Sequence, residues 1–234
     1  NSDIISSIEF LKNINTASYN SENLTTASQG LDGDEHGSWS AKDLFKNQDI
    51  LIIGSGESAK KYLKPIIQYI NKKKPLVFSL NFNDPSFLPN ENIDFYIACN
   101  DLRILMDSNN YKNLGKPIIM PISRLSKNIK ESFANINVLD FGLRLDKKSF
   151  KIFENGCILN KPLALSYALS IASAGGANRI LLAGIDGYDA LDTRQQDMIN
   201  LFFTYLNSKE ALPVLAITPT NLPIKKSSIF KPLL

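Results

Sequence analysis

The sequence lacks several features that would place a protein in a class at once. Its two cysteines, Cys99 and Cys157, do not form a Cys-x-x-Cys pair, which favours a reducing compartment and gives no support to a zinc site. No apolar run approaches the roughly 18 residues of a membrane span. The amphipathic opening segment contains Asp3 and Glu9 and is unlike a signal peptide. We therefore predict a cytoplasmic protein without a membrane span.

Histidine and an excess of charge of one sign are also lacking. The single histidine, His36, stands in a polar segment, which disfavours Ser-His-Asp and Cys-His hydrolases and histidine-rich metal enzymes. A general-base role for His36 would require that segment to fold over the edge of the sheet. With 26 basic and 23 acidic residues the net charge is +3, which argues against a strongly electrostatic nucleic-acid binder. The clearest basic run, Lys72–Lys74, is expected to end a helix.

The chain is predicted to comprise an N-terminal extension, residues 1–37, and one domain, residues 38–234. Apolar residues at helical spacing over residues 3–17 predict a helix, and the polar residues 18–39 predict a linker or loop. Ser40 with Asp43 three residues later resembles a helix N-cap and predicts a short helix through Phe45. The chain begins at Asn1 and not at Met, which we interpret as the sign of an excised part of a longer polypeptide.

From residue 49 onward, short apolar runs alternate with segments of helical periodicity. The runs predict buried strands at residues 50–53, 76–80, 95–98, 117–120, 136–139, 180–183 and 214–217. Helices are predicted at residues 57–71, 162–173 and 192–207, and Pro65 should kink the first of these or mark its restart. Strands that alternate with helices form βαβ units. We therefore predict an α/β, Rossmann-like three-layer domain with a mainly parallel sheet.

The first core strand runs into the turn Gly54-Ser55-Gly56-Glu57-Ser58. Glycine permits close approach of the backbone to a ligand, and the N-terminus of the following helix favours an anion. The turn is neither a G-x-G-x-x-G fingerprint nor a Walker A loop. Glu57 would repel an anion unless its side chain points away. We predict that Gly54, Ser55, Gly56, Glu57 and Ser58 contact a phosphate-bearing ligand, the alternative being a tight strand-to-helix turn.

Polar residues also follow the next two predicted strands. Asn81 either reads a base or ribose edge or forms an Asx turn. Asn100 and Asp101, with Arg103 nearby, either contact ligand hydroxyls or phosphate or cap a helix. Ligands of parallel α/β sheets bind at the carboxyl ends of the strands, so all of these loops are candidates for one site.

The loop after residue 183 places the Asp186 carboxylate between two glycines. Asp186 is the best available base or metal ligand, and Gly184, Gly187 and Tyr188 are predicted to line the same site. For Asp192, a turn-and-cap role is favoured over metal binding, and no metal site is predicted. The hydroxyls in Thr218-Pro219-Thr220 are predicted to line the crevice as well.

Four segments together resemble a domain found at the C-terminus of bacterial aldolases of the 4-hydroxy-2-oxovalerate or HMG-lyase-like type, from surface-polysaccharide gene clusters. The resemblance covers roughly residues 38–230. The segments are Ile52–Ser58, Leu182–Tyr188, Ile217–Thr220 and Ser228–Phe230. It implies that any lyase chemistry lies in a barrel upstream of Asn1, because the metal-ligand histidines of such a barrel are absent from these residues.

The Gly-x-Gly-x-Ser turn and the later Gly-x-Asp more distantly resemble two other groups. These are the flagellin-glycosylation accessory proteins, with their pterin pyrophosphokinase relatives, and the CMP-sialic-acid-dependent sialyltransferases. The second resemblance implies that the turn and Asn81 face a nucleotide. It also implies a histidine base late in the chain, and this chain has none after His36. Glu57 stands where those families commonly have proline.

Three hypotheses follow. The first is a nucleotide- or nucleotide-sugar-binding, glycosyltransferase-like domain in surface-polysaccharide biosynthesis, with phosphate at the Gly54–Ser58 turn, base or ribose near Asn81 and Asn100, and acceptor near Asp186 and Tyr188. The second is a non-catalytic module of an aldolase-type lyase, with a regulatory or assembly role. The third, a small kinase or pyrophosphokinase using Mg²⁺, is weakened by the missing P-loop lysine. Mg²⁺ and homo-oligomer formation stay open.

Overall fold

The computed structural model describes residues 33–82 and 87–231, so the helix predicted over residues 3–17 lies outside the described residues. One large sheet has the strand order β11-β10-β9-β1-β2-β3-β4-β5, and every neighbouring pair in it is parallel. Its strands are β1 (Asp49–Ile53), β2 (Leu76–Leu80), β3 (Phe95–Ile97), β4 (Ile118–Met120), β5 (Val138–Asp140), β9 (Arg179–Ala183), β10 (Val214–Ala216) and β11 (Lys225–Lys226). The predicted parallel α/β fold is confirmed.

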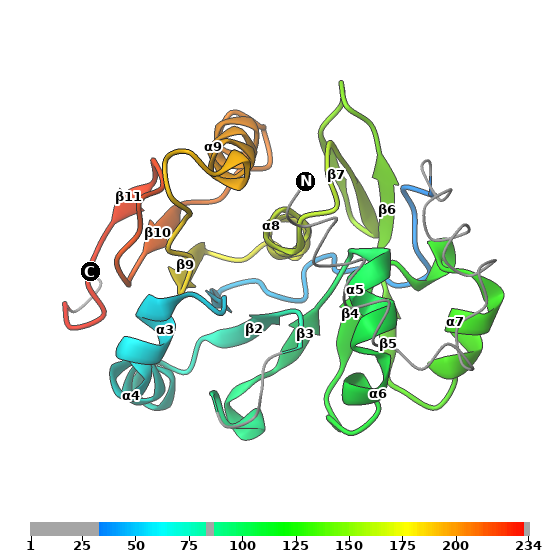
Figure 1. The fold of residues 1–234 in the computed structure, drawn as a ribbon, viewed down its shortest axis with the longest axis horizontal. Helices are drawn as coiled ribbons and strands as arrows, with labels where there is room; N and C mark the ends of the chain where they lie inside the picture. The colour runs from blue at the N-terminus through cyan, green and yellow to red at the C-terminus, as the bar shows by residue number, and fades with distance from the viewer. Residues whose placement is uncertain (1–32, 83–86, 232–234) are drawn as a thin grey trace.

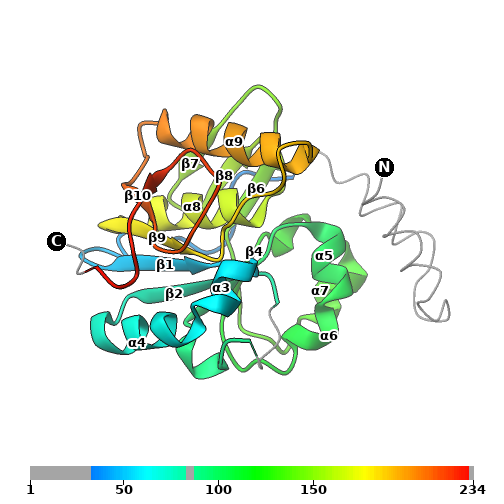
Figure 2. The same ribbon diagram turned by 60° about the vertical axis from the view of Figure 1, so that its left-hand side comes forward.

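Helices cover both faces of this sheet (Figures 1 and 2). On one face lie α3 (Glu57–Lys61), α4 (Leu63–Lys73), α5 (Asp101–Met106), α6 (Ser108–Tyr111) and α7 (Lys127–Ser132), and on the other α8 (Ala164–Ala174) and α9 (Thr193–Leu206). Two 3-10 turns, η2 (Asn90–Asn92) and η3 (Ile122–Arg124), complete the described helical segments. Alternate residues of each central strand face opposite layers, so that Ile50 and Ile52 pack towards α8 and α9 and Leu51 and Ile53 towards α3 and α4.

The order of the strands reverses between β1 and β9. The chain adds β2 to β5 successively on one side of β1 and then returns through α8 to place β9 on the other side. The carboxyl ends of β1 and β9 therefore diverge into loops that leave in opposite directions. Such a switch point is where open α/β sheets form a ligand crevice.

A second, three-stranded sheet was not predicted from the sequence. It consists of β6 (Gly142–Leu145), β8 (Gly156–Leu159) and β7 (Lys151–Phe153), with β8 in the centre, and it packs beside α8. The first described residues are bonded to both sheets: Gly37 N–H donates at 2.9 Å to Asn155 O, between β7 and β8, and Trp39 N–H donates at 2.9 Å to Asp140 O, in β5 of the large sheet. Residues 34–37, which the sequence places in a linker, thus lie against the domain.

The predicted helices are largely confirmed, with one correction. The segment at 57–71 is divided at Tyr62 into α3 and α4, with Pro65 in the first turn of α4, and Lys72 and Lys73 lie in its last turn. The short helix predicted after Ser40 is wrong, because those residues form turns. Ser40 Oγ does accept the Lys42 N–H at 3.2 Å, but Asp43 has a φ of 63°, which ends any helical path.

Candidate functional site

A cleft of about 990 Å³ lies at the carboxyl ends of β1, β2, β3 and β9, across the β1/β9 switch point. Ten of the predicted site residues line it: Gly54, Ser55, Gly56, Glu57, Asn81, Asn100, Gly184, Asp186, Gly187 and Tyr188. The remaining lining residues are Leu80, Leu102, Arg103, Met106, Pro162, Leu163, Ala164, Leu165, Ile185 and Met198. A volume of this order is typical of small-molecule sites.

The Gly54–Ser58 turn is bonded to the loop after β9. Gly54 N–H donates to Ala183 O at 2.9 Å, and Gly56 N–H donates to Gly184 O at 3.0 Å. Ser58 N–H donates to the Asp186 carboxylate at 2.8 Å. The anion position predicted for a phosphate at Ser58 is thus occupied by the protein's own carboxylate. The N–H groups of Ser55 and Glu57 make no hydrogen bond with described residues, and both residues line the cleft.

The glycines of the two loops are explained by their mutual packing. A Cβ atom on Gly56 would lie 2.7 Å from Asp186 Cγ, and one on Gly54 would lie 2.5 Å from Ile185 Cδ1. Gly184 has a φ of +68° and its α-carbon faces the Gly54 carbonyl. These glycines bring one turn against the other. The close approach of the two turns is enough to account for these glycines.

Ser58, Asp186 and Thr218 form a polar network behind the cleft. Ser58 Oγ donates to Asp186 Oδ1 and lies 2.9 Å from Thr218 Oγ1, which in turn accepts the Gly184 N–H at 2.9 Å. Thr220 Oγ1 donates to Asp186 O at 3.3 Å. Ser58, Thr218 and Thr220 are buried and do not line the cleft, so the predicted direct contacts of these three hydroxyls with a ligand are not supported by their positions.

Asn81, after β2, and Asn100, after β3, differ in the hydrogen bonds that their side chains make with described residues. Asn81 has a φ of 56°, a conformation that asparagine tolerates, and its carboxamide makes no hydrogen bond with described residues. Asn83 and Asp84 lie outside the described residues. Asn100 Oδ1 accepts the Arg103 N–H at 3.0 Å, so the N-cap interpretation of Asn100 is confirmed, although its side chain also borders the cleft.

Asp101 does not belong to the cleft. It forms a buried ion pair with Arg124, whose Nη2 lies 3.2 Å from Asp101 Oδ2, with 10% and 4% of the two side chains exposed. Burial raises the pKa of Asp101, and the pairing with Arg124 opposes that rise only in part. The predicted ligand contact of Asp101 is therefore corrected to a structural pair between the start of α5 and the end of η3.

Two features of the cleft favour an anionic group. Arg103 is the one lysine or arginine among the described residues that line it; its Nε donates to Asp107 at 2.8 Å, and its terminal nitrogens make no hydrogen bond with described residues. The N-terminus of the 11-residue helix α8 also borders the cleft, and its N-cap residue Leu163 provides no side-chain hydrogen bond. The sequence analysis missed the contribution of residues 162–165, because a predicted helix alone does not show which sheet edge its end meets.

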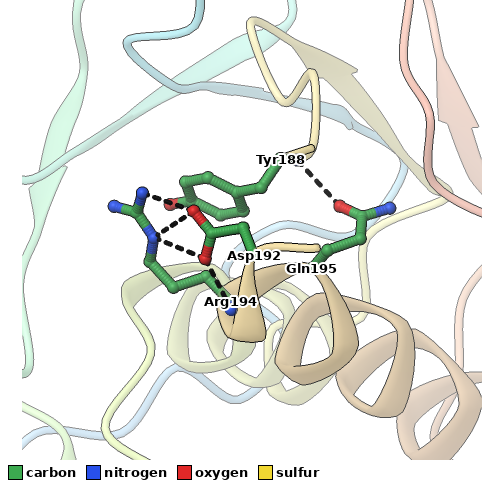
Figure 3. Close-up of polar contacts among 4 residues, drawn as sticks. All are labelled: Tyr188, Asp192, Arg194 and Gln195. Carbon is green, nitrogen blue, oxygen red and sulfur yellow. Dashed lines mark hydrogen bonds and ion pairs between the residues drawn. The ribbon is translucent and has the colours of Figure 1, made fainter. Parts of the chain in front are cut away.

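Tyr188 forms a fixed aromatic wall at the rim (Figure 3). Its N–H donates to Gln195 Oε1 at 2.7 Å, and the Arg194 guanidinium lies 4.3 Å from the centre of its ring. Arg194 is held in turn by Asp192, with Nη2 2.6 Å from Asp192 Oδ2. Asp192 also accepts the Arg194 N–H at 2.8 Å as the N-cap of α9, which confirms its predicted cap role.

His36 does not reach the cleft. Its Nδ1 lies 2.8 Å from Asn155 Oδ1, and its ring packs on Phe153 in the small sheet. Within residues 33–82 and 87–231, no three His, Cys, Asp or Glu side chains are grouped to hold a metal ion. Across the same residues, no helix is both long and apolar enough to cross a bilayer.

Comparison with known proteins shows the fold alone. No family model matches the chain, and no curated protein matches it. A solved structure with a similar fold is the MAf glycosyltransferase from Magnetospirillum magneticum AMB-1, with a TM-score of 0.57 and 13% sequence identity. The match covers 91% of this chain and 38% of that one, so this chain spans well under half of that protein. The predicted resemblance to aldolase-type lyases finds no support in these comparisons.

Proposed function

We propose that the chain is a glycosyltransferase-like domain that binds a nucleotide or nucleotide-sugar in the cleft at the β1/β9 switch point and acts in bacterial surface-polysaccharide biosynthesis. The observation that carries the proposal is the convergence there of four strand-end loops and the N-terminus of α8. The name of the structural neighbour, a glycosyltransferase, supports the same class.

Within the cleft, the charged groups favour one orientation of such a ligand. The Ser58 N–H is taken by Asp186, so the phosphates are assigned to Arg103, the Ser55 and Glu57 N–H groups and the α8 N-terminus. The carboxamide of Asn81, which makes no hydrogen bond with described residues, suits the base or ribose, and Asn100 lines the same cleft. The acceptor is assigned to the rim at Tyr188.

Asp186 is assigned a positioning role. Both of its carboxylate oxygens accept hydrogen bonds from Ser58, and these bonds hold the Gly54–Ser58 turn. A base role would require one of these oxygens to exchange its Ser58 partner for the acceptor hydroxyl. Asp186→Asn separates the two roles: it keeps an acceptor for the Ser58 N–H, so positioning predicts near-normal ligand affinity and near-normal turnover, whereas a base role predicts loss of turnover at unchanged affinity.

A thermal-shift screen tests the binding proposal. CMP, UMP, AMP, GMP and their sugar conjugates are each added at saturating concentration, with and without Mg²⁺. Ligand at about 100 times its Kd stabilises a protein by roughly 2.7 kcal/mol, which is about 5–10 °C for a chain of this size. No shift with any nucleotide would contradict the proposal.

Matched variants assign the binding to this cleft. Asn81→Gly removes the carboxamide but accepts the left-handed backbone, and Arg103→Gln removes the one lining cation. Each should weaken nucleotide binding about tenfold. Lys147→Gln, on an exposed loop away from the cleft, is the control and should bind as the wild type does. If all three variants bind the nucleotide as tightly as the wild type does, the nucleotide binds elsewhere.

A second candidate is a non-catalytic module of an aldolase-type polypeptide. It is favoured by two observations: no histidine is among the described residues that line the cleft, and both carboxylates that line it are already bonded, Asp186 to Ser58 and Glu57 to Lys60. Nucleotide-sugar binding without hydrolysis or transfer, followed by ³¹P NMR over a range of sugar acceptors, would support this candidate. Release of nucleotide that depends on acceptor would contradict it.

A further inference from the structure

A basic and aromatic patch lies where α3 ends and the C-terminal segment passes it. It comprises Lys60, Lys61, Lys64, Phe230 and Lys231, all exposed. The rings of Tyr62 and Phe230 meet edge to face at 6.2 Å between centres, and Lys61 Nζ lies 5.9 Å from the centre of the Tyr62 ring. Both ribbon views show the C-terminal segment beside α3 (Figures 1 and 2). Residues more than 160 positions apart in the sequence thus form one surface.

The patch is strongly cationic for a protein of net charge +3. Glu57 pairs with Lys60 at 3.1 Å, but no carboxylate among the described residues forms an ion pair with Lys61, Lys64 or Lys231. Two more exposed lysines, Lys225 and Lys226, precede this segment on the edge strand β11. A complementary partner must therefore be anionic.

The patch also contains an exposed aromatic residue, Phe230. Its side chain is 70% exposed, although the neighbouring Ile229 is buried and its N–H donates to Ile217 O at 2.9 Å. The backbone is thus anchored, while the aromatic ring is largely exposed and packs by its edge or face on Tyr62. An exposed aromatic ring that shares a surface with lysines matches the boundary of an anionic bilayer, where lysines meet phosphates and the ring enters the acyl region.

We propose that this patch binds the surface of an anionic lipid bilayer, holding the domain peripherally. The proposal goes beyond nucleotide binding and does not depend on it. It has a spatial consequence for the cleft: Glu57 borders the cleft and Lys61 lies in the patch, four residues on, about 6 Å along α3. A lipid-linked or membrane-bound substrate would then reach the cleft from the surface on which the domain rests.

Vesicle co-sedimentation with the full chain tests the proposal. Vesicles of phosphatidylcholine with about 30% phosphatidylglycerol should retain the protein, and pure phosphatidylcholine should not. Raising NaCl from about 50 to about 500 mM should release it. No retention by anionic vesicles at low salt, or equal retention by neutral ones, would overturn the proposal.

Three variants assign the binding to the patch. Lys61→Glu with Lys64→Glu should weaken partition at least about tenfold, and Phe230→Ser about fivefold. Lys147→Glu with Lys148→Glu makes the same change of charge on a loop of the small sheet and should bind like the wild type.

If this control loses binding equally, the effect is one of net charge and the proposal fails. If a heparin column retains the wild type while vesicles do not, the patch binds a soluble polyanion and the proposal is again wrong. All variants alter exposed side chains, and an unchanged thermal midpoint verifies that they fold.

Discussion

The main-chain N–H of Ser58 donates to the carboxylate of Asp186 at 2.8 Å, across 128 positions of sequence. This bond places a negative charge at the start of α3, where an open helix N-terminus would otherwise receive a ligand anion. It also joins the loops of the two strands that flank the switch point. The shape of the cleft floor therefore depends on this contact. Its removal should lower the stability of the fold even when no ligand is present.

Ser58→Ala should destabilise the fold. The buried Ser58 hydroxyl donates to a charged acceptor, and loss of such a bond costs about 2 kcal/mol. Ser55→Ala is the matched control in the same turn, since its side chain is exposed and should change stability by less than about 0.5 kcal/mol. Urea denaturation measures both. Equal stability of the two variants would show that the Ser58 hydroxyl contributes nothing.

Gly56→Ala should destabilise the fold without any ligand present. The added methyl group would lie 2.7 Å from Asp186 Cγ and 2.7 Å from Gly184 O, so the two turns must separate, at a cost of about 2 kcal/mol. Loss of ligand binding in this variant would therefore not prove ligand contact at Gly56. The thermal midpoint of the unliganded variant is the measurement, and an unchanged midpoint would refute the packing explanation.

Asn81→Ala should be less stable than Asn81→Gly. Both remove the carboxamide, but alanine carries a Cβ that disfavours the φ of 56°, which costs about 1 kcal/mol. If the amide is the ligand group, both variants should show the same loss of nucleotide affinity after correction for stability. Isothermal titration separates the two effects. Retained affinity in the glycine variant would exclude the amide as a contact.

The ion pair at the start of α9 should give stability a defined pH dependence. The Arg194 side chain first, and then its N–H, lower the pKa of Asp192 from its ordinary value of 3.8. The ionised form therefore stabilises the fold above that value, and the contribution is lost as the pH falls through the lower folded pKa. Asp192→Asn keeps the cap acceptor without the charge. The difference in unfolding free energy between wild type and variant should be constant from about pH 5 to 7 and shrink below about pH 4. A difference independent of pH would contradict this.

Both thiols should be inert in the native protein. Cys99 and Cys157 are fully buried, and burial raises the pKa of each thiol, which suppresses the reactive thiolate. Ellman's reagent should titrate no thiol at neutral pH and two after addition of denaturant. Rapid reaction of either thiol in the native state would show that its layer of the core opens locally.

The sequence predicts the strands and the residues that line the cleft better than it predicts what each of those residues does. Buried parallel strands such as Ile50–Ile53 are continuous apolar runs, and β1, β2 and β9 each end at a glycine or polar residue that necessarily lies at the carboxyl edge. Ten predicted residues meet in the cleft for this reason. The small sheet was missed because charged residues interrupt the apolar pattern of its strands, Arg144 in β6 and Lys151 in β7, and β8 has only three apolar residues after Gly156.

Partnerships between distant residues could not be predicted. The role of Gly56 depends on Asp186, that of Asp101 on Arg124, and that of Thr218 on Ser58. Each residue has an equally good local explanation as a turn, cap or ligand contact. Only the strand order decides between them: β9 lies beside β1 for Gly56 and Asp186, β3 beside β4 for Asp101 and Arg124, and β10 next along from β9 for Thr218.

The packing of Gly54 and Gly56 against Gly184 and Asp186 also has an evolutionary consequence. Neither turn can change its size alone, because a side chain added to one meets the backbone or carboxylate of the other. In an alignment of homologous chains, the positions of these two turns should therefore covary as pairs. A larger residue at 56 should appear together with a shorter one at 186, whatever ligand the cleft of each homologue has come to bind.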